Sequence, residues 1–378
     1  MPVKHFISGR QKYKGNRYFR HIQKIFKMKA AVLTKYREFE VKEMPVREIQ
    51  PDEVLVKIEY ASICGSDMHI FTGDFHPRTP VPFIPGHEMA GFIAKVGDEV
   101  KNFVKGEKVA IDPIVWCGKC PACLEGHYPA CTSLKLIGID EDGGFCEYVA
   151  VPESMLYKVP ENLSSKYAAL VEIYSIGFHA NKRAGVKSGD TIAIWGAGRV
   201  GQVILQAART KTKEKVFIVD IIQNRLDIAV KSNSNIIAIN ALHENPVEAI
   251  KRYTEGKGVP IAFEAVGHAY PVKGVVHPIR GCIQSIKGGG TVCTLGLSDE
   301  AAPIVFKELI WKEGKIVTSR VRHGEFAEAI DQLAKGNLNP DALISEIMPV
   351  EDIQKAFELL ESNPEKYLKI LIDFTTNL

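Results

Sequence analysis

The sequence contains no uninterrupted apolar stretch of the roughly 18 residues that a membrane-spanning helix requires, so we expect neither a membrane span nor a membrane partner. Its first 27 residues contain eight Lys or Arg and no Asp or Glu. Without this segment, 40 basic residues face 45 acidic ones, so the formal charge of +3 comes from the N-terminus. A nucleic-acid partner inferred from charge would depend on these residues alone, and we expect none.

Residues 1–27 also lack the continuous apolar core of a secretory signal. We consider three interpretations of this basic N-terminal extension: that the native chain begins at Met28, that the segment is disordered, and that it is a targeting peptide. Cysteine is scarce, with eight in 378 residues. Without a secretory signal we expect a cytoplasmic location, where disulfides are disfavoured.

The length suits two domains. From residue 28 to about residue 159, short β-type runs alternate with Gly and Pro, which predicts an irregular, barrel-like β domain. From about residue 180, runs such as TIAIWGAG, KVFIVD and IIAIN alternate with helical patterns. This alternation predicts an α/β fold with a doubly wound parallel sheet covered by helices on both faces.

A glycine-rich turn follows the first of these runs, with Gly196, Gly198 and Gly201 in G-x-G-x-x-G spacing. The preceding β-branched run, the following helical pattern and Asp220, 19 residues after the last glycine, are the context of a dinucleotide site. The second glycine would let the backbone approach a pyrophosphate. Asp220 would bind the ribose hydroxyls and repel a 2′-phosphate, which predicts NAD, whereas Arg225 could cover the adenine or offset that repulsion.

Four cysteines, Cys117, Cys120, Cys123 and Cys131, follow C-x2-C-x2-C-x7-C. Four thiolates form a closed tetrahedral shell, which is typical of a structural zinc site because no position remains for a substrate. An iron–sulfur cluster and unligated reduced thiols are the alternatives.

A second set of ligand types is spread along the chain: Cys64 in CGSDMH, His87 and Glu88 in GHE, and Glu172 in VEIYS. One thiolate, one imidazole and one or two carboxylates make an incomplete shell, which keeps a position open for water or substrate.

Taken together, GHE, the four-cysteine loop and GAGxxG followed by an Asp resemble the zinc-containing medium-chain alcohol dehydrogenase family. CGSDMH, DGGFCEYVAVP and the Glu of VEIYSIGFHA resemble its polyol and sugar-acid branch, which includes sorbitol and galactonate dehydrogenases. The resemblance implies a GroES-like β-barrel catalytic domain (28–179), a Rossmann NAD-binding domain (180–320) and a C-terminal part of the catalytic domain (321–378).

The resemblance also implies residue roles. Cys64, His87 and Glu172 look like catalytic zinc ligands, with Glu88 as a ligand or exchange partner, and Asp67 resembles the carboxylate that orients the imidazole. The implied NAD-binding residues are Gly196, Gly198, Val200, Gly201, Asp220, Arg225, Leu295, Gly296, Leu297 and Ser319.

The implied chemistry is hydride transfer from a secondary alcohol to the nicotinamide, with zinc as Lewis acid. Ser66 would accept the hydroxyl proton and His69 would pass it to solvent. Arg320 resembles a substrate-facing arginine of the polyol branch, suited to a carboxylate or vicinal hydroxyls. We expect Lys287 and Arg322 to be solvated.

The predicted function is therefore oxidation of a polyol or sugar acid with NAD, by an enzyme with two zinc ions per chain. One alternative is a dehydrogenase of a simple alcohol or amino alcohol, similar to threonine 3-dehydrogenase. A non-catalytic binding protein of the same fold is another, although both ligand sets are kept. The family also implies a homodimer or homotetramer joined at the edges of the Rossmann sheets.

Overall fold

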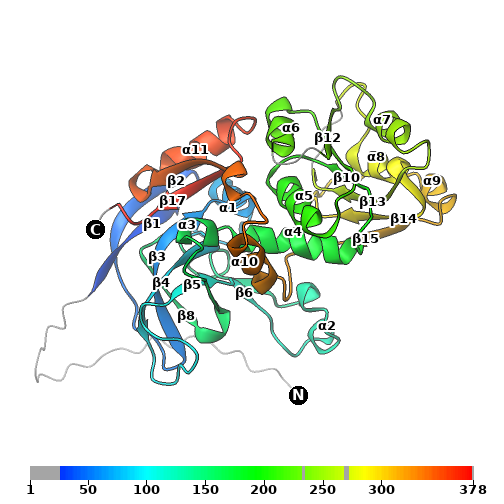
Figure 1. Ribbon diagram of the computed structural model, residues 1–378. Coiled ribbons are helices and arrows are strands. Elements are labelled where there is room, and N and C mark those ends of the chain that lie inside the picture. Colours follow the sequence, from blue (N-terminus) through cyan, green and yellow to red (C-terminus); the bar gives the residue numbers. More distant parts are fainter. Residues whose placement is uncertain (1–25, 232–234, 268–271, 377–378) are drawn as a thin grey trace, which may run out of the picture.

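The structure is a computed structural model that describes residues 26–231, 235–267 and 272–376. The predictions for residues 1–25 lie outside these described residues. Two sheet-based units lie side by side, and helix α4 (Val171–Ala184) runs between them (Figure 1). Within the described ranges, no helix is both long and apolar enough to cross a membrane.

The first unit is built on a seven-stranded sheet in which β8 pairs with β3 beside the path β16-β17-β3-β4-β5-β9. Two small antiparallel pairs, β1-β2 and β6-β7, accompany it. The strands are β1 (Lys27–Lys35), β2 (Glu38–Pro45), β3 (Glu53–Ser62), β4 (Glu88–Val96), β5 (Lys108–Ile111), β6 (Ile114–Val115), β7 (Lys135–Leu136), β8 (Tyr148–Pro152), β9 (Leu156–Lys158), β16 (Ile344–Pro349) and β17 (Lys369–Asp373). β1 thus begins one residue before the predicted domain start at residue 28.

Short helices connect these strands. They are α1 (Gly65–Thr72), α2 (Pro121–Leu124), α3 (Ser165–Ala168) and the 3-10 turns Tyr128–Ala130, Glu153–Met155, Pro340–Ala342 and Val350–Asp352.

The C-terminal segment returns to the first unit. β17 pairs antiparallel with β3, with Leu371 opposite Ser62. On α11 (Ile353–Ser362), the ring of Phe357 lies 4.8 Å from that of Phe39 and 5.1 Å from that of Phe71. The two ends of the chain therefore share one apolar core.

The second unit is a six-stranded parallel sheet of order β12-β11-β10-β13-β14-β15. Its strands are β10 (Ile192–Trp195), β11 (Val216–Asp220), β12 (Ile236–Asn240), β13 (Val259–Glu264), β14 (Ile286–Thr294) and β15 (Lys315–Thr318). The helices are α5 (Arg199–Lys211), α6 (Gln223–Val230), α7 (Pro246–Tyr253), α8 (Pro278–Ser285) and α9 (Phe306–Ile310), followed by α10 (Phe326–Ala334).

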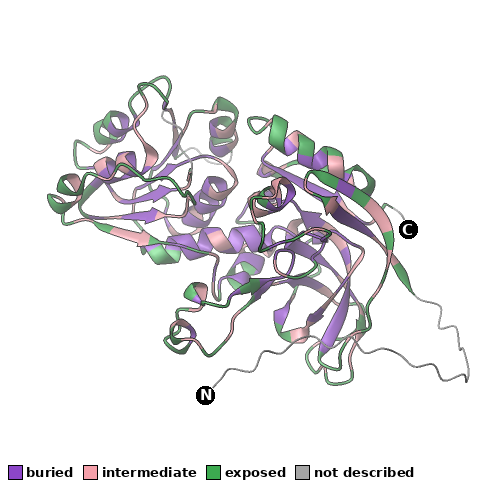
Figure 2. Ribbon diagram, turned by 180° about the vertical axis from the view of Figure 1, so that it is seen from behind, coloured by how far each residue is buried: buried purple, intermediate pink, exposed green. Residues whose placement is uncertain are grey.

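Side chains alternate across this sheet as the pleat requires. Ile192 and Ile194 of β10 pack with residues of α4, α5 and α6, whereas Ala193 and Trp195 pack with residues of α7 and α8. Helices therefore cover both faces, and the predicted α/β class with a doubly wound sheet is confirmed. Buried residues fill both sheets and most of α4 (Figure 2).

Helix α4 joins the two cores. Tyr174 and Phe178 pack in the cluster that also contains Ala90 of β4, whereas Ala180 and Ala184 pack with β10 and α5. Since its first turn carries Glu172, the helix that links the units also delivers a carboxylate to the space beside β4.

Candidate active site

Cys64 lies at the start of α1, directly after β3. It is the N-cap of this helix, and its backbone N–H donates a 2.8 Å hydrogen bond to Oδ2 of Asp67. A carboxylate in the first helical turn satisfies an otherwise unpaired N–H and suits the positive end of the helix dipole. The local sequence CGSD therefore fixes the thiol and the carboxylate relative to each other.

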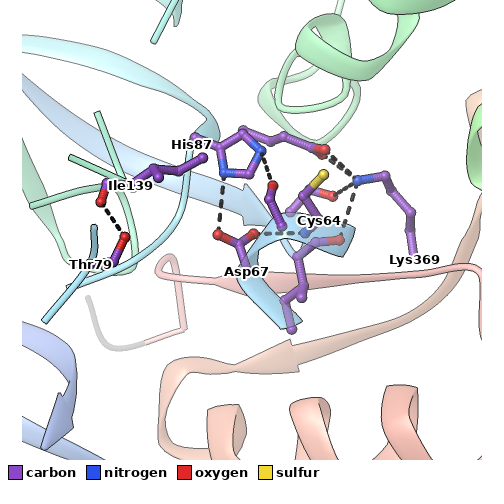
Figure 3. A network of polar contacts seen from close by, with 10 residues as sticks. Cys64, Asp67, Thr79, His87, Ile139 and Lys369 are labelled. Carbon is purple, nitrogen blue, oxygen red and sulfur yellow. Dashed lines mark hydrogen bonds and ion pairs between the residues drawn. The ribbon is translucent and has the colours of Figure 1, made fainter. Parts of the chain in front are cut away.

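His87 precedes β4, and its ring lies beside Asp67 and Cys64 (Figure 3). Its Nδ1 is 3.2 Å from Oδ1 of Asp67, and its Nε2 is 3.3 Å from Oγ of Ser66. Because Asp67 engages Nδ1, Nε2 is the nitrogen left to face a metal ion. Burial opposes the imidazolium, but the charges of Asp67 and Cys64 outweigh it and raise the pKa of His87 well above its usual value.

The ligand atoms of Cys64, His87 and Glu88 lie within 4.8 Å of one another. These residues come from the start of α1 and the start of β4, which are neighbours because β4 pairs antiparallel with β3. The set of a sulfur, a nitrogen and an oxygen donor fits Zn²⁺ better than a hard cation such as Mg²⁺.

Glu88 already has a cationic partner. Nζ of Lys369 donates to both carboxylate oxygens of Glu88, at 2.6 and 2.5 Å, and neither side chain is exposed. Lys369 also donates to Oγ of Ser62 at 3.1 Å and to the carbonyl oxygen of Ile63 at 3.2 Å. Lys369 is not among the predicted site residues, although a lone cation at the start of the apolar strand KILIDF indicates a buried acidic partner.

Glu172 is 3% exposed, and its Oε2 is buried without any hydrogen-bond partner in the described part of the chain. Burial, opposed by the positive charges of Arg322 and His87, raises the pKa of the Glu172 carboxyl. A buried carboxylate oxygen without a partner is costly unless a ligand satisfies it. The charges of His87, Glu88 and Lys369 act on this carboxyl, but Glu172 is not among the ligand atoms that lie within 4.8 Å of one another, which are those of Cys64, His87 and Glu88.

The prediction that Arg322 is solvated is wrong, because this residue has no exposed surface. Its guanidinium donates to both carboxylate oxygens of Asp112, at 2.6 and 2.5 Å, and lies 4.5 Å from the ring centre of Phe326. Arg322 therefore pins the segment that leaves β15 to the end of β5. Lys287, in contrast, is exposed as expected.

His69 and Arg320, the other two predicted polar residues, reach solvent. Nδ1 of His69 lies 2.9 Å from Oδ2 of Asp74, and the histidine side chain is 49% exposed. Arg320 is exposed and donates a 2.9 Å hydrogen bond to the carbonyl oxygen of Pro129. Ser66 therefore lies next to His87, whereas His69 and Arg320 lie at the periphery.

The four cysteines of the loop, Cys117, Cys120, Cys123 and Cys131, lie close together. All four ligand atoms lie within 4.8 Å of one another, and none of the chain's eight cysteines forms a disulfide. Backbone N–H groups of Thr132 and Cys123 lower the pKa of Cys120 to about 6, whereas burial and neighbouring thiols raise the pKa of Cys123 to about 12. A thiolate beside protonated thiols fits a Zn²⁺ that displaces the remaining protons on binding.

The loop also contacts the segment that follows β15. The rings of Tyr128 and His323 stack with their centres 4.2 Å apart, and Trp116 meets His323 edge-on at 5.6 Å. Together with the bond from Arg320 to Pro129, these contacts attach the loop to the crossing between the two units.

The glycine-rich turn lies between β10 and α5, and its three glycines differ in steric demand. Gly196 has φ +99°, which side chains disfavour, and a Cβ on Gly201 would lie 1.8 Å from the carbonyl oxygen of Gly196. A Cβ on Gly198 would meet only Nη1 of Arg225, at 3.7 Å. The fold therefore requires the first and third glycines, while the open space at Gly198 fits a pyrophosphate at the start of α5.

Asp220 ends β11 beside this turn. Its Oδ2 accepts a 2.6 Å hydrogen bond from the N–H of Ala197, and its Oδ1 accepts from the N–H groups of Ile221 and Ile222 at 2.8 and 2.9 Å. Nη1 of Arg225 lies 4.0 Å from Oδ2. The carboxylate is therefore held in one orientation at the place where an adenosine ribose would lie.

The other predicted cofactor residues follow neighbouring strands. Val200 packs on the core at the start of α5. The N–H groups of Leu295 and Gly296 donate to the carbonyl oxygen of Glu264, Leu297 is 84% exposed, and the buried Oγ of Ser319 lacks a described partner. Since β10, β11, β13, β14 and β15 are parallel, these residues share the carboxyl edge of one sheet, where such folds bind dinucleotides.

Comparison with known families agrees with this geometry. Residues 50–161 match the model of the alcohol dehydrogenase GroES-like domain, and residues 200–335 match the model of the zinc-binding dehydrogenases. The first range covers the candidate ligands Cys64, His87 and Glu88 and the four-cysteine loop. The second covers most of the parallel sheet.

Individual relatives span nearly the whole chain. Sorbitol dehydrogenase of Bacillus subtilis is 33% identical over 349 residues, which are 91% of this chain and 97% of the relative. 2-Dehydro-3-deoxy-L-galactonate 5-dehydrogenase of Pseudoalteromonas atlantica is 31% identical, over 86% of this chain and 92% of its own length. The structure of RspB from Escherichia coli with NADH superposes with a TM-score of 0.84 at 29% identity, covering 92% and 99% of the two chains. The chain belongs to the zinc-binding dehydrogenase family.

Proposed function

We propose that this protein transfers a hydride from a secondary alcohol of a polyol or sugar acid to NAD, with one catalytic and one structural zinc ion per chain. The observation that carries the proposal is the convergence of Cys64, His87 and Glu88, and the buried Oε2 of Glu172, which has no hydrogen-bond partner among the described residues, supports a further oxygen donor. The names of the related sorbitol and galactonate dehydrogenases support the substrate class. NADH in the related RspB structure and the fixed carboxylate of Asp220 support the cofactor.

In this proposal, Cys64, His87 and Glu172 hold the catalytic ion, because Lys369 occupies both oxygens of Glu88. When bound, the zinc supplies a Lewis acid for the alcohol oxygen. Ser66, whose Oγ lies beside Nε2 of His87, takes up the hydroxyl proton. His69 is open to solvent and passes the proton out.

Glu172→Gln tests the ligand assignment. We expect zinc content, measured by elemental analysis, to fall from two ions per chain to one, and NADH formation to fall by about 10³-fold or more. Glu88→Gln is the matched control, because it removes a neighbouring buried carboxylate that is already paired. If Glu172→Gln keeps two ions and Glu88→Gln loses one, Glu88 and not Glu172 is the zinc ligand.

An amino-alcohol substrate, as in threonine 3-dehydrogenases, is the second candidate. It is favoured over a sugar acid because Arg320, the residue predicted to bind a substrate carboxylate, is exposed and donates its hydrogen bond to the carbonyl oxygen of Pro129. A screen of aldonates, polyols, small alcohols and threonine with NAD and NADP separates the candidates. For an aldonate substrate, Arg320→Gln should raise KM about tenfold or more, while polyol oxidation stays unchanged.

We further propose a cytoplasmic homo-oligomer joined at β15. In the described residues this strand pairs only with β14, so its outer edge is free for a second copy. Large apolar side chains of the adjacent segment are exposed: Phe306 at 65%, Ile310 at 70% and Trp311 at 77%. Analytical ultracentrifugation should show a dimer or tetramer, and Trp311→Glu should shift the distribution toward monomer.

A further inference from the structure

Arg199 is a charged side chain whose position the proposed reaction does not explain. It is the first residue of α5 and follows Gly198, the glycine with open space around it. Among the described residues, no partner forms a hydrogen bond or ion pair with Arg199. A half-buried guanidinium at a helix N-terminus is unfavourable by itself, because the helix dipole there also repels a cation.

The guanidinium of Arg199 reaches the opposite unit. A Cβ built on Gly65 would lie 3.0 Å from Nη2 of Arg199. Gly65 begins α1, between the proposed zinc ligand Cys64 and the proposed proton acceptor Ser66. The N-termini of α1 and α5 therefore meet across the cleft, with the arginine head group between them.

A second guanidinium lies close by. Arg199 and Arg225 line one cavity of about 190 Å³, together with Gly198 on the nucleotide side and Leu360, Pro364 and Tyr367 on the other side. None of the described residues that line this cavity is acidic. Burial and the charge of Arg199 lower the pKa of Arg225, against the charges of Asp220 and Glu365. Nη2 of Arg225 donates to the carbonyl oxygen of Pro364, whereas its buried Nε has no partner among the described residues. Two neighbouring cations, one of them with an unused N–H donor, are suited to an anion.

We propose that Arg199 binds the pyrophosphate of the dinucleotide with its head group between the starts of α1 and α5, and that the glycine at position 65 leaves room for this head group. The inference rests on the proposed cofactor. It adds a phosphate ligand that the G-x-G-x-x-G spacing does not specify, because Arg199 occupies one of the unspecified positions of that pattern.

The experiment compares ligands with different numbers of phosphates by calorimetry on the full chain: ADP-ribose, AMP and adenosine. Arg199→Gln should weaken ADP-ribose binding by about 10- to 100-fold and AMP binding by less, and adenosine binding should stay within about twofold. Arg199→Lys should recover part of the loss. Arg252→Gln, an exposed arginine of α7 paired with Glu244, is the matched control and should bind as the wild type does.

The contact with Gly65 is tested separately. Gly65→Val should weaken ADP-ribose binding about threefold or more in the wild type, and by less in the Arg199→Gln background, since the two residues share one contact. Equal ADP-ribose affinity of Arg199→Gln and wild type overturns the proposal. So does an equal loss for adenosine, which has no phosphate. Absence of ADP-ribose binding by the wild type would instead refute the proposed cofactor, and this inference with it.

Discussion

Lys369 and Glu88 form an ion pair in which neither side chain has exposed surface, although they are 281 residues apart in the chain. Lys369 is the first residue of β17, and Glu88 is the first residue of β4, directly after His87. The pair therefore fastens the C-terminal segment to the proposed metal site.

Removing the cation of this pair should be strongly destabilising. We expect Lys369→Met to lower the free energy of unfolding by about 3–5 kcal/mol, because it leaves a buried carboxylate without its partner. Urea denaturation measures this. Lys27→Met, which breaks an exposed pair with Glu43, should cost under about 1 kcal/mol. Equal stability of the two variants would contradict the buried pairing, and Glu88→Gln should restore part of the loss in Lys369→Met.

Glu325 gives a prediction about pH. Its carboxylate pairs with Nδ1 of His179 at 3.1 Å and with Nζ of Lys182 at 2.8 Å. Although burial opposes ionisation, these partners lower the pKa of Glu325 from 4.5 to about 2. Because the folded-state pKa is depressed, the contribution to stability is present above about pH 4.5 and is lost as the pH falls toward about 2.

The matching variant is Glu325→Gln. It should lower the free energy of unfolding by about 1–3 kcal/mol at pH 7, and the difference from the wild type should shrink between pH 4.5 and the acid limit of the measurement. Urea denaturation at a series of pH values provides the test. A difference that is constant with pH would show that the carboxylate's charge does not contribute.

The second zinc ion of each chain is expected in the four-cysteine loop. Cys120→Ser should reduce zinc content from two ions per chain to one and lower the melting temperature, since a structural ion stabilises the fold that binds it. Cys293→Ala is the control, because Cys293 is a buried thiol outside both ligand sets and should keep two ions. Unchanged zinc content in Cys120→Ser would support unligated thiols.

We expect the charge of Asp220 to determine the preference for NAD over NADP. Asp220→Asn keeps oxygen and amide groups near the N–H groups of Ala197 and Ile222 but removes the negative charge. The affinity for NADP should rise about tenfold relative to that for NAD, because repulsion of the 2′-phosphate disappears while Arg225 remains. Fluorescence titration with NADH and NADPH measures the ratio. An unchanged ratio would mean that Asp220 does not contact the adenosine ribose.

Local patterns predicted much of the second unit. The helical pattern after the glycine-rich turn corresponds to α5, which begins at Arg199, and β11 ends at Asp220 as the motif requires. The spacing of the four cysteines likewise brought their sulfur atoms together. In each case the signal lies within about 25 consecutive residues, so neighbouring side chains and turns determine the outcome.

Other features leave no such local signal. Helix α4 was not predicted, because it is buried on most of its surface and therefore lacks the polar face that marks a helix. Arg322 was expected in solvent because arginine is rarely buried alone, but its partner Asp112 lies 210 residues earlier in the chain. For Lys369, the apolar run KILIDF indicates burial, but it does not identify the partner Glu88, which lies 281 residues earlier. Long-range ion pairs become visible only when the topology is known.

The unequal crowding around the three turn glycines gives a practical rule for redesign. Libraries that seek a different coenzyme should keep positions 196 and 201 constant, since strain or collision there would eliminate most clones before any screen. Diversity belongs at position 198, where a Cβ would meet nothing closer than 3.7 Å, and at positions 199 and 225, whose arginines line the same cavity. Selection at those three codons would then report on coenzyme recognition rather than on foldability.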